Sequence, residues 1–258
     1  MIRLQTGKTS VKQRSQAETD MFWDEDEKKG PYQVPEDIVD VGFKVISKSL
    51  PLEHAHELYT ALNELLPWIE DESQLGIHQI HGAESGNGWT RPEDAENELL
   101  YLSRRARFYI RTPDHRLDEI KALTGQVLDI AGHQLELGST IIKPLSTQSE
   151  QFSRYVIVEE GEEHEADFLK RVVSELNQLL EIKVRKIMCG KPHTIRLPEE
   201  TIRTRSIMVA DLEPEIAVKL QQQGVGRGRQ YGCGLFLPHK GIKAVGETED
   251  KTHFTGAK

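Results

Sequence analysis

Hydrophobic and polar positions in the first half of the chain follow strand and helix periods in turn. From Ile38 they alternate, which predicts a strand whose buried side carries Val39, Val41, Phe43 and Val45. Leu50-Pro51 ends this pattern, and apolar residues in 52–68 then recur at helical spacing. Strand patterns in 77–80, 99–112 and 126–145, with a helical pattern in 114–124, give the order β-α-β-β-α-β.

The second half repeats this order after a polar joint at residues 146–150. A strand around Tyr155 precedes a strongly amphipathic helix in 163–180. Two long strand patterns on either side of Pro198-Glu199-Glu200 predict a hairpin, and a helix over 214–223 and a closing strand at 235–237 follow. Two successive β-α-β-β-α-β units predict an α+β protein of two tandem ferredoxin-like (RRM-like) modules.

This organisation divides the chain into four segments. Residues 1–37 are polar and aperiodic, which is typical of a loosely ordered N-terminal extension. We expect an N-terminal ferredoxin-like domain at 38–146 and a C-terminal one at 150–243, joined by the polar residues between them. The polar composition of residues 244–258 predicts a flexible tail. A loop rich in Gly, Asn and Ser is expected at 82–88.

A glycine-rich stretch, Gly224–Gly234, lies between the last predicted helix and the last predicted strand. Its glycines allow positive φ and close backbone approach, and successive amides in such a loop can form an anion-binding nest. Arg227 and Arg229 add planar donors suited to phosphate, and Tyr231 adds a stacking face. A dinucleotide-binding loop would follow a strand and open a helix, so this order excludes one. A phosphate-rich polymer fits the loop best, and a mobile surface turn is the alternative.

Charge along the chain is distributed unevenly. The 258 residues carry a net charge of −9, which taken whole argues against nucleic-acid binding. Residues 171–243, however, hold 13 Lys and Arg against 7 Asp and Glu, whereas residues 1–170 hold 18 against 32. Basic charge therefore gathers around the glycine-rich stretch, as expected where one face meets a polyanion. The acidic half indicates ordinary solvated surface or a face for protein partners.

The remaining features of the sequence limit the cellular compartment in which we expect the protein. No run approaches the ~18 apolar residues of a membrane span, and the N-terminus lacks the apolar stretch of a signal peptide. Two cysteines, Cys189 and Cys233, do not make a disulfide framework. These features predict a cytoplasmic protein with free thiols.

Two ferredoxin-like modules with a Gly-x-Gly-x-Gly…Gly-x-Gly loop before the last strand resemble the CRISPR-associated repeat-processing endoribonucleases, the sixth Cas protein. The resemblance covers residues 38–243, and Leu50–Leu62 with Leu66-Pro67-Trp68 is similar to the opening of the Myxan-type subgroup. It implies a role in antiviral defence: metal-independent cleavage of CRISPR precursor transcripts within each repeat, without a cofactor. It also implies ends with a 2′,3′-cyclic phosphate and a 5′-hydroxyl, and other Cas subunits of a type I surveillance complex as partners.

Such cleavage moves two protons, and histidine suits these steps because its pKa lies near neutral pH. The family commonly uses a histidine in or just before the first helix, and His54 occupies that position here. His56 points about 200° round the helix, so only one of the two can face the scissile phosphate, and His54 is preferred. Tyr59 is a further candidate. On the residues alone, a solvated histidine and a core tyrosine are the alternatives.

His78 and His81 have a spacing that metal ligands also show, but no Cys or carboxylate pattern completes a site, so no metal is expected. For RNA we expect phosphate contacts from the glycine-rich stretch, through Gly224, Gly226, Arg227, Gly228, Arg229 and Tyr231. The basic hairpin is expected to grip the repeat stem by shape and phosphate, through Arg185, Lys186, Lys191, Arg196, Arg203 and Arg205. A charged sheet edge that resists aggregation is its alternative function.

Three functions remain open from the sequence. The resemblance favours an endoribonuclease specific for repeat RNA. A non-catalytic repeat-RNA binding subunit of a CRISPR effector complex would show the same basic loop without a working histidine. A protein-interaction subunit would instead use the acidic half, and its RNA binding would be absent or insensitive to salt.

Overall fold

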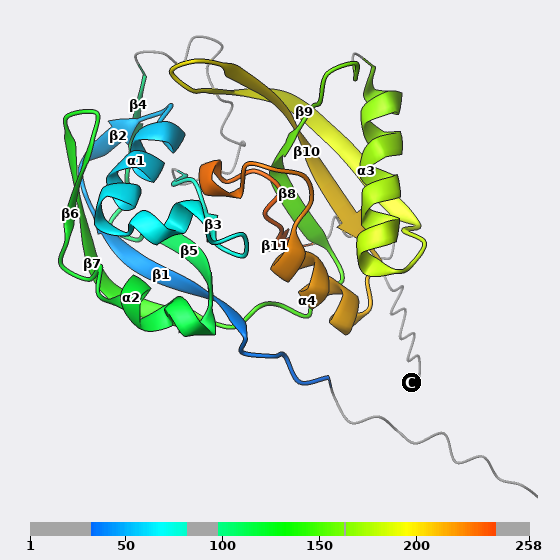
Figure 1. The fold of residues 1–258 in the computed structure, drawn as a ribbon, viewed down its shortest axis with the longest axis horizontal. Coiled ribbons are helices and arrows are strands. Elements are labelled where there is room, and N and C mark those ends of the chain that lie inside the picture. Colours follow the sequence, from blue (N-terminus) through cyan, green and yellow to red (C-terminus); the bar gives the residue numbers. More distant parts are fainter. Residues whose placement is uncertain (1–31, 82–97, 163, 241–258) are drawn as a thin grey trace, which may run out of the picture. The chain divides into compact units, whose positions relative to one another are not determined.

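The computed structural model of the chain describes residues 32–81, 98–162 and 164–240. Most of the N-terminal extension, the expected loop at 82–88 and the expected tail at 244–258 lie outside the described residues. The described residues form a mixed α+β fold, as the periodicity predicts (Figure 1).

The first half builds a five-stranded antiparallel sheet in the order β3-β5-β1-β7-β6. Its elements are β1 (Ile38–Ile46), β2 (Ser49–Pro51), α1 (Ala55–Leu65), η1 (Pro67–Glu70), β3 (Gly76–Ile77), β4 (Leu99–Tyr101), β5 (Arg107–Pro113), η2 (Asp114–Arg116), α2 (Leu117–Lys121), β6 (Val127–Ile130) and β7 (His133–Lys143).

Three local features of this half differ from the sequence pattern. Leu50-Pro51 does not simply end a strand, because it forms β2, which pairs with β4 in a separate ribbon. Pro67 divides the expected helix into α1 and the short η1. The long strand pattern at 126–145 is a hairpin of β6 and β7, which turns at Ala131 and Gly132 with left-handed φ of 52° and 83°.

The second half builds a four-stranded antiparallel sheet in the order β11-β8-β10-β9. Its elements are β8 (Gln151–Ile157), α3 (Glu165–Leu180), β9 (Lys186–Arg196), β10 (Thr201–Ala210), α4 (Pro214–Gln223), η3 (Arg229–Tyr231) and β11 (Leu237–Pro238). In each sheet the first strand lies between the third and fourth strands of its unit, with β6 as an addition in the first. The ferredoxin-like prediction is confirmed, while the division of the two halves into separate domains stays a prediction.

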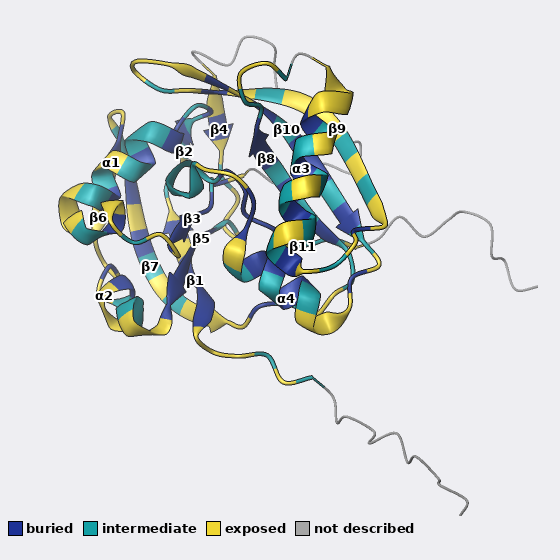
Figure 2. Cartoon of the chain, turned by 45° about the vertical axis from the view of Figure 1, so that its right-hand side comes forward, coloured by how far each residue is buried: buried dark blue, intermediate teal, exposed yellow. Residues whose placement is uncertain are grey.

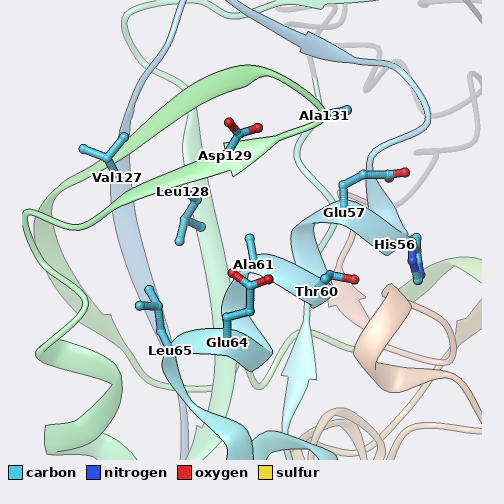
Figure 3. Close-up of a pocket in the computed structure, with 10 residues that line it drawn as sticks. All are labelled: His56, Glu57, Thr60, Ala61, Glu64, Leu65, Val127, Leu128, Asp129 and Ala131. Atoms are coloured by element: carbon cyan, nitrogen blue, oxygen red, sulfur yellow. The ribbon is translucent and has the colours of Figure 1, made fainter.

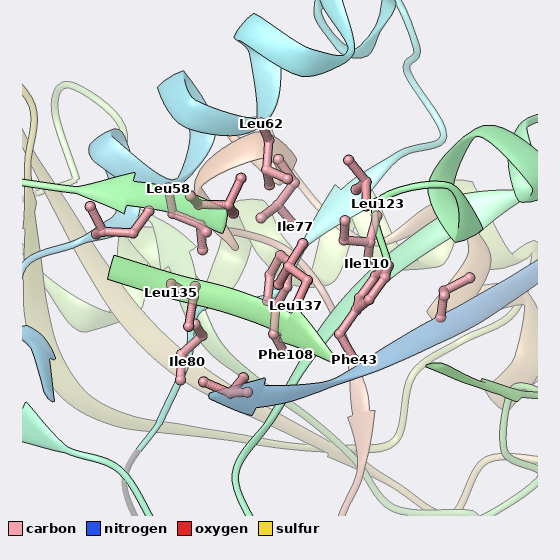
Figure 4. Close-up of a cluster of buried hydrophobic side chains, with 14 of the residues drawn as sticks. Phe43, Leu58, Leu62, Ile77, Ile80, Phe108, Ile110, Leu123, Leu135 and Leu137 are labelled. Atoms are coloured by element: carbon pink, nitrogen blue, oxygen red, sulfur yellow. The ribbon is translucent and has the colours of Figure 1, made fainter. Parts of the chain in front are cut away.

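Each half buries its own apolar cluster. In the first, Leu58 and Leu62 of α1 pack over Phe43, Leu135 and Leu137 of the sheet (Figure 4). In the second, one side of α3 is buried with Phe168, Val172, Leu176 and Leu180 while its other side is exposed (Figure 2). Burial of each such side chain contributes about 1.5–3 kcal/mol. The helical and strand periods seen in the sequence therefore correspond to these two packed layers.

A third, smaller cluster joins the halves. It brings Ala55 at the start of α1 together with Tyr155 and Ile157 of β8 and Cys233 of the loop before β11, and it also includes Ile195 and Ile202. Because residues of both halves are buried in it, the N-terminal end of α1 is fixed against the second half.

A buried ion pair lies beside this junction. Arg111 of β5 is fully buried, and its guanidinium binds both carboxylate oxygens of Asp40 on β1, with N–O distances of 2.8 and 3.0 Å. Its remaining nitrogen, Nη1, donates to the carbonyl oxygens of Gln221 at 2.7 Å and Phe236 at 3.1 Å. Burial alone raises the pKa of Asp40, but Arg111 and the nearby His78 outweigh it and hold that pKa below its ordinary value of 3.8.

Arg111 therefore connects the first half to the backbone on both sides of the glycine-rich stretch. We predict that Arg111→Leu lowers the free energy of unfolding at pH 7 by about 3–5 kcal/mol, because it leaves a buried carboxylate and two carbonyls without partners. Urea unfolding of both proteins measures this difference. A loss below about 1 kcal/mol would contradict a structural role for the pair.

The Asp40–Arg111 ion pair should also make the stability of the protein depend on pH in acid. Because the pKa of Asp40 is lowered in the folded protein, its contribution is complete above pH 3.8 and is lost as the pH falls below that value. The stability advantage of the wild type over Asp40→Asn is therefore expected to shrink below that pH.

Candidate functional site

The glycine loop, residues 224–234, has an ordered backbone whose amides are largely hydrogen-bonded within the protein. Its five glycines all adopt left-handed φ between 66° and 84°. The amide of Val225 donates to the carbonyl of Gly234 at 3.1 Å, and the amide of Gly234 donates to Tyr155 at 2.7 Å. The amides of Tyr231 and Cys233 both turn back onto the carbonyl of Gly228. Several amides that an open phosphate nest would present are thus used inside the protein, and the loop is a fixed part of the fold.

The glycine loop rests on the first half of the chain. The side-chain amide of Gln79 donates to the carbonyl of Tyr231 at 2.8 Å. Gly232 lies so close to β3 that a Cβ there would meet the carbonyl oxygen of Ile77 at 3.2 Å, a contact that the backbone would have to move to relieve. In Figure 1 the orange segment after α4 accordingly passes beside β3 and α1. The loop and the helix α1 therefore form one surface.

Arg229 holds this arrangement and is not directed at solvent. Its guanidinium donates to backbone carbonyls on both sides of the junction: Gln74, Leu75, Gln222 and Gln223, at 2.7 to 3.2 Å. Burial and the nearby Arg111 lower the pKa of Arg229 to about 10, so it stays charged at neutral pH. These bonds argue against the predicted phosphate contact and give Arg229 a structural role.

His54 is also engaged by the backbone. Its side chain is buried at the start of α1, where Nδ1–H donates to the carbonyls of Pro51 at 2.9 Å and Leu52 at 3.2 Å. The amide of Ile80 donates to Nε2 at 3.1 Å. Burial lowers the pKa of His54, and its backbone partners fix one neutral tautomer. The preference for His54 as the proton-transfer group is therefore not supported by its position, and a connecting role between α1 and the end of the β3 segment fits better.

His56 instead lies half-exposed next to the glycine loop. Its ring is 6.5 Å from the ring of Tyr231, measured between centroids. Its Nδ1 is buried and has no hydrogen-bond partner among the described residues. Tyr59, one turn further along α1, meets Tyr231 edge-on at 5.4 Å. The structure thus brings together three residues that the sequence analysis named from two distant segments.

Burial, with a contribution from Glu70, raises the pKa of Tyr59, and burial likewise raises that of Tyr231. Both phenols are therefore protonated at neutral pH and can donate hydrogen bonds. A histidine beside two phenols offers groups for proton transfer and for binding an anionic oxygen.

A cavity of about 400 Å³ opens beside α1, on the side away from Tyr231. This helix cavity is lined by Glu57 and Glu64 of α1 and by Asp129 of β6, and His56 lies at one end of it (Figure 3). The three carboxylates make the helix cavity unfavourable for a phosphate backbone. An RNA strand that reaches His56 is therefore expected to approach from the loop.

A second cavity, of about 440 Å³, lies between η1 and the glycine loop. This loop cavity is lined by Tyr59, Ile69, Glu70, Glu72, Ser73, Leu75, Gly226, Arg227, Gly228, Arg229, Gln230 and Tyr231. Tyr231 belongs to its wall and also touches His56, so the loop cavity adjoins the candidate catalytic group.

Two carboxylates occupy the outer edge of the glycine loop. Glu159 pairs with the exposed Arg227, with N–O distances of 3.3 and 3.4 Å. Glu175 of α3 accepts the amide of Gly226 at 2.6 Å and is itself paired with Arg171. Arg227 thus remains the loop arginine that can reach a phosphate, once it leaves Glu159.

A family model described as Cas6 Crispr matches residues 39–241, most of the chain and nearly all of the part described above. The chain belongs to the Cas6 CRISPR family. The resemblance drawn from the glycine loop and the first helix is confirmed at this level.

Related proteins agree with this assignment. The CRISPR-associated endonuclease Cas6 of Myxococcus xanthus (strain DK1622) is 30% identical over 203 residues, which span 78% of this chain and 81% of that protein. A solved structure described as CRISPR associated protein Cas6 covers 79% of this chain and 100% of its own, with a TM-score of 0.54 and 10% identity. Another, described as an RAMP protein binding different RNA substrates, covers 77% and 98%, with a TM-score of 0.53 and 16% identity. These two structures support the fold.

The basic hairpin of this Cas6-family chain carries its predicted residues mostly on the surface. Arg185, Lys186, Lys191, Arg196 and Arg203 are exposed on or beside β9 and β10. Lys186 pairs with Asp211 at 2.6 Å, and Arg205 pairs with Glu165 at 3.1 Å. Their contact with RNA stays a prediction.

The paired histidines point to different surroundings. His78 is buried with its Nε2 3.7 Å from a carboxylate oxygen of Asp40, whereas the ring of His81 lies tilted by 39° against that of Tyr155, with 6.1 Å between centroids. No group of three or more His, Cys, Asp or Glu side chains in the described part of the chain is arranged to hold a metal ion. No helix among the described residues is long and apolar enough to cross a membrane.

The glycine loop gives a direct test of its fixed geometry. Gly226 and Gly234 share nearly the same φ, 67° and 66°, so an alanine at either position meets similar backbone strain of about 1–2 kcal/mol. A Cβ at 226 meets no atom within 4 Å, whereas at 234 it would overlap the carbonyl of Val225. We predict that Gly234→Ala lowers the free energy of unfolding clearly more than Gly226→Ala, as measured by urea unfolding. Equal losses would mean that the loop is not closed as described.

Proposed function

We propose that this chain is a metal-independent endoribonuclease that binds CRISPR repeat RNA and cleaves precursor transcripts to guide RNA. Its products would end in a 2′,3′-cyclic phosphate and a 5′-hydroxyl. Membership of the Cas6 family and a relative named an endonuclease support RNA processing in general. The observation that carries the mechanism is the contact between His56 on α1 and Tyr231 in the glycine loop.

In the proposed reaction, the 2′-oxygen of one nucleotide attacks the adjacent phosphorus and loses its proton. The bond from phosphorus to the 5′-oxygen breaks, and that oxygen takes up a proton. His56 carries out one of these transfers, since its side chain is half-exposed beside Tyr231 of the glycine loop. We propose that a protein side chain also carries out the other transfer, so that no metal ion takes part.

Residues of the glycine loop stabilise the negative charge on the reacting phosphate. Arg227 is exposed on the same loop as Tyr231, and its guanidinium suits two phosphate oxygens. The neutral phenols of Tyr59 and Tyr231 are the nearby donors. The exposed lysines and arginines of the β9–β10 hairpin would hold the repeat stem by its phosphates.

The two histidines form a matched pair for testing the mechanism. We expect His56→Ala to slow cleavage by about 10²–10⁴-fold, the usual size of a lost proton-transfer group, without changing stability. His54→Ala should instead lower the free energy of unfolding, because it removes three hydrogen bonds to the backbone. Single-turnover cleavage of repeat RNA in EDTA and urea unfolding separate these effects.

Two outcomes would contradict the mechanism. Full cleavage by His56→Ala would remove His56 from the reaction. Cleavage of RNA with a 2′-deoxy substitution at the scissile nucleotide would exclude attack by the 2′-oxygen. Tight RNA binding with no cleavage by the wild type would favour the alternative, a non-catalytic repeat-RNA binding subunit.

Salt-dependent binding tests the proposed contact between Arg227 and a phosphate. Removing one phosphate contact weakens binding of every RNA sequence and reduces the slope of log K against log salt by about 1. We predict this result for Arg227→Ala. Glu159→Gln releases Arg227 from its carboxylate and is expected to strengthen binding. Filter binding of repeat RNA from low to high salt measures both, and an unchanged slope in Arg227→Ala would exclude its phosphate contact.

A further inference from the structure

The loop cavity has the size and the walls of a ligand site. Its volume of about 440 Å³ lies within the range of about 300–1,000 Å³ that is usual for small-molecule sites. The buried side chains of Ile69 and Leu75 supply apolar surface, and Tyr59 and Tyr231 supply aromatic surface. Single-stranded nucleic acid is commonly held by aromatic side chains that stack bases beside cationic groups that meet the phosphates. Arg227 provides that cation in the lining of the same cavity.

Glu70 is the unexpected member of the lining. Its side chain is exposed and makes no ion pair within the described ranges, unlike Glu72, which lies 3.1 Å from His115 and 4.0 Å from Arg116. A carboxylate beside an RNA strand repels its phosphates, and a hydrogen bond that it accepts from a base can offset this cost. Carboxylates accept such bonds from exocyclic amino groups, for example N4 of cytosine.

The neighbours of the cavity indicate which nucleotide would enter it. The ring of Tyr231 lies near both the ring of His56, at 6.5 Å, and the ring of Tyr59, at 5.4 Å. A base next to Tyr59 and Tyr231 therefore belongs to a nucleotide beside the phosphate that His56 reaches. The opposite direction is occupied by the carboxylates of the helix cavity.

We propose that the loop cavity binds one unpaired nucleobase of the RNA, next to the scissile phosphate, and that Glu70 selects a base with an exocyclic amino group. The proposal rests on the proposed function. Uracil has a carbonyl oxygen where cytosine has its amino group, so this oxygen would face the carboxylate of Glu70 and weaken binding.

Binding of non-cleavable RNA tests the selection. Repeat RNA with a 2′-deoxy scissile nucleotide is prepared with uridine substituted, one at a time, at each amino-bearing base flanking the cleavage point. For the wild type, we expect one substitution to weaken binding by about 10-fold or more. In Glu70→Gln this difference should largely vanish, since an amide can accept from an amino group or donate to a carbonyl. Glu64→Gln, an exposed carboxylate of α1 in the helix cavity, is the matched control and should keep the wild-type discrimination.

Stacking has its own signal. With 2-aminopurine at the discriminating position, fluorescence should fall on binding to the wild type and much less on binding to Tyr59→Leu. The proposal is overturned if no flanking position discriminates against uridine, or if Glu70→Gln discriminates as the wild type does. Cleavage of the unmodified RNA with either result would leave the proposed function standing, whereas a wild type that neither binds nor cleaves repeat RNA would end both.

Discussion

The position of the glycine loop depends on two arginines, the buried Arg111 and the half-buried Arg229, that cross the junction of the halves in opposite directions. Arg111 in the first half donates to the carbonyls of Gln221 and Phe236, just before and just after the loop. Arg229 within the loop donates back to Leu75 in the first half. A buried guanidinium is stable only if its donors are satisfied, so the two halves cannot shift without leaving charge unpaired. This constraint fixes the distance between α1 and the loop.

A proton-transfer group and an anion-binding group act together only if they are held within hydrogen-bond reach of one phosphate. His56 and Tyr231 are about 175 residues apart in sequence, yet their rings lie 6.5 Å apart. The contact follows from three features: the small cluster around Ala55, the absence of a side chain at Gly232, and the arginines at the junction. Different residues therefore support the fold and form the candidate site. His54 and Arg229 bind backbone groups, whereas His56 and Arg227 are the residues proposed to meet RNA.

That separation explains how much of the protein can be read from its sequence. Period and spacing predict both β-α-β-β-α-β units, because each element buries one face within its own half. They do not distinguish His54 from His56, or Arg227 from Arg229, because the partners that decide these roles are carbonyls and amides from distant segments. The role proposed for Glu70 has no signal in sequence, because the cavity that it lines forms between segments that are distant in the chain.

Electrostatics at the site also resolve the conflict between a net charge of −9 and a polyanionic ligand. In the proposed function, carboxylates near the glycine loop constrain the RNA and do not simply repel it. Glu159 and Glu175 occupy the donors of Arg227 and Gly226 when no phosphate is bound, which keeps these donors from pairing elsewhere. The carboxylates of the helix cavity would repel an RNA strand that entered this cavity. Acidic charge near an RNA site lowers affinity for any sequence by a similar amount, so only an RNA that satisfies the remaining donors and acceptors recovers the loss. Specificity for one repeat can therefore come from the acidic residues as much as from the basic ones.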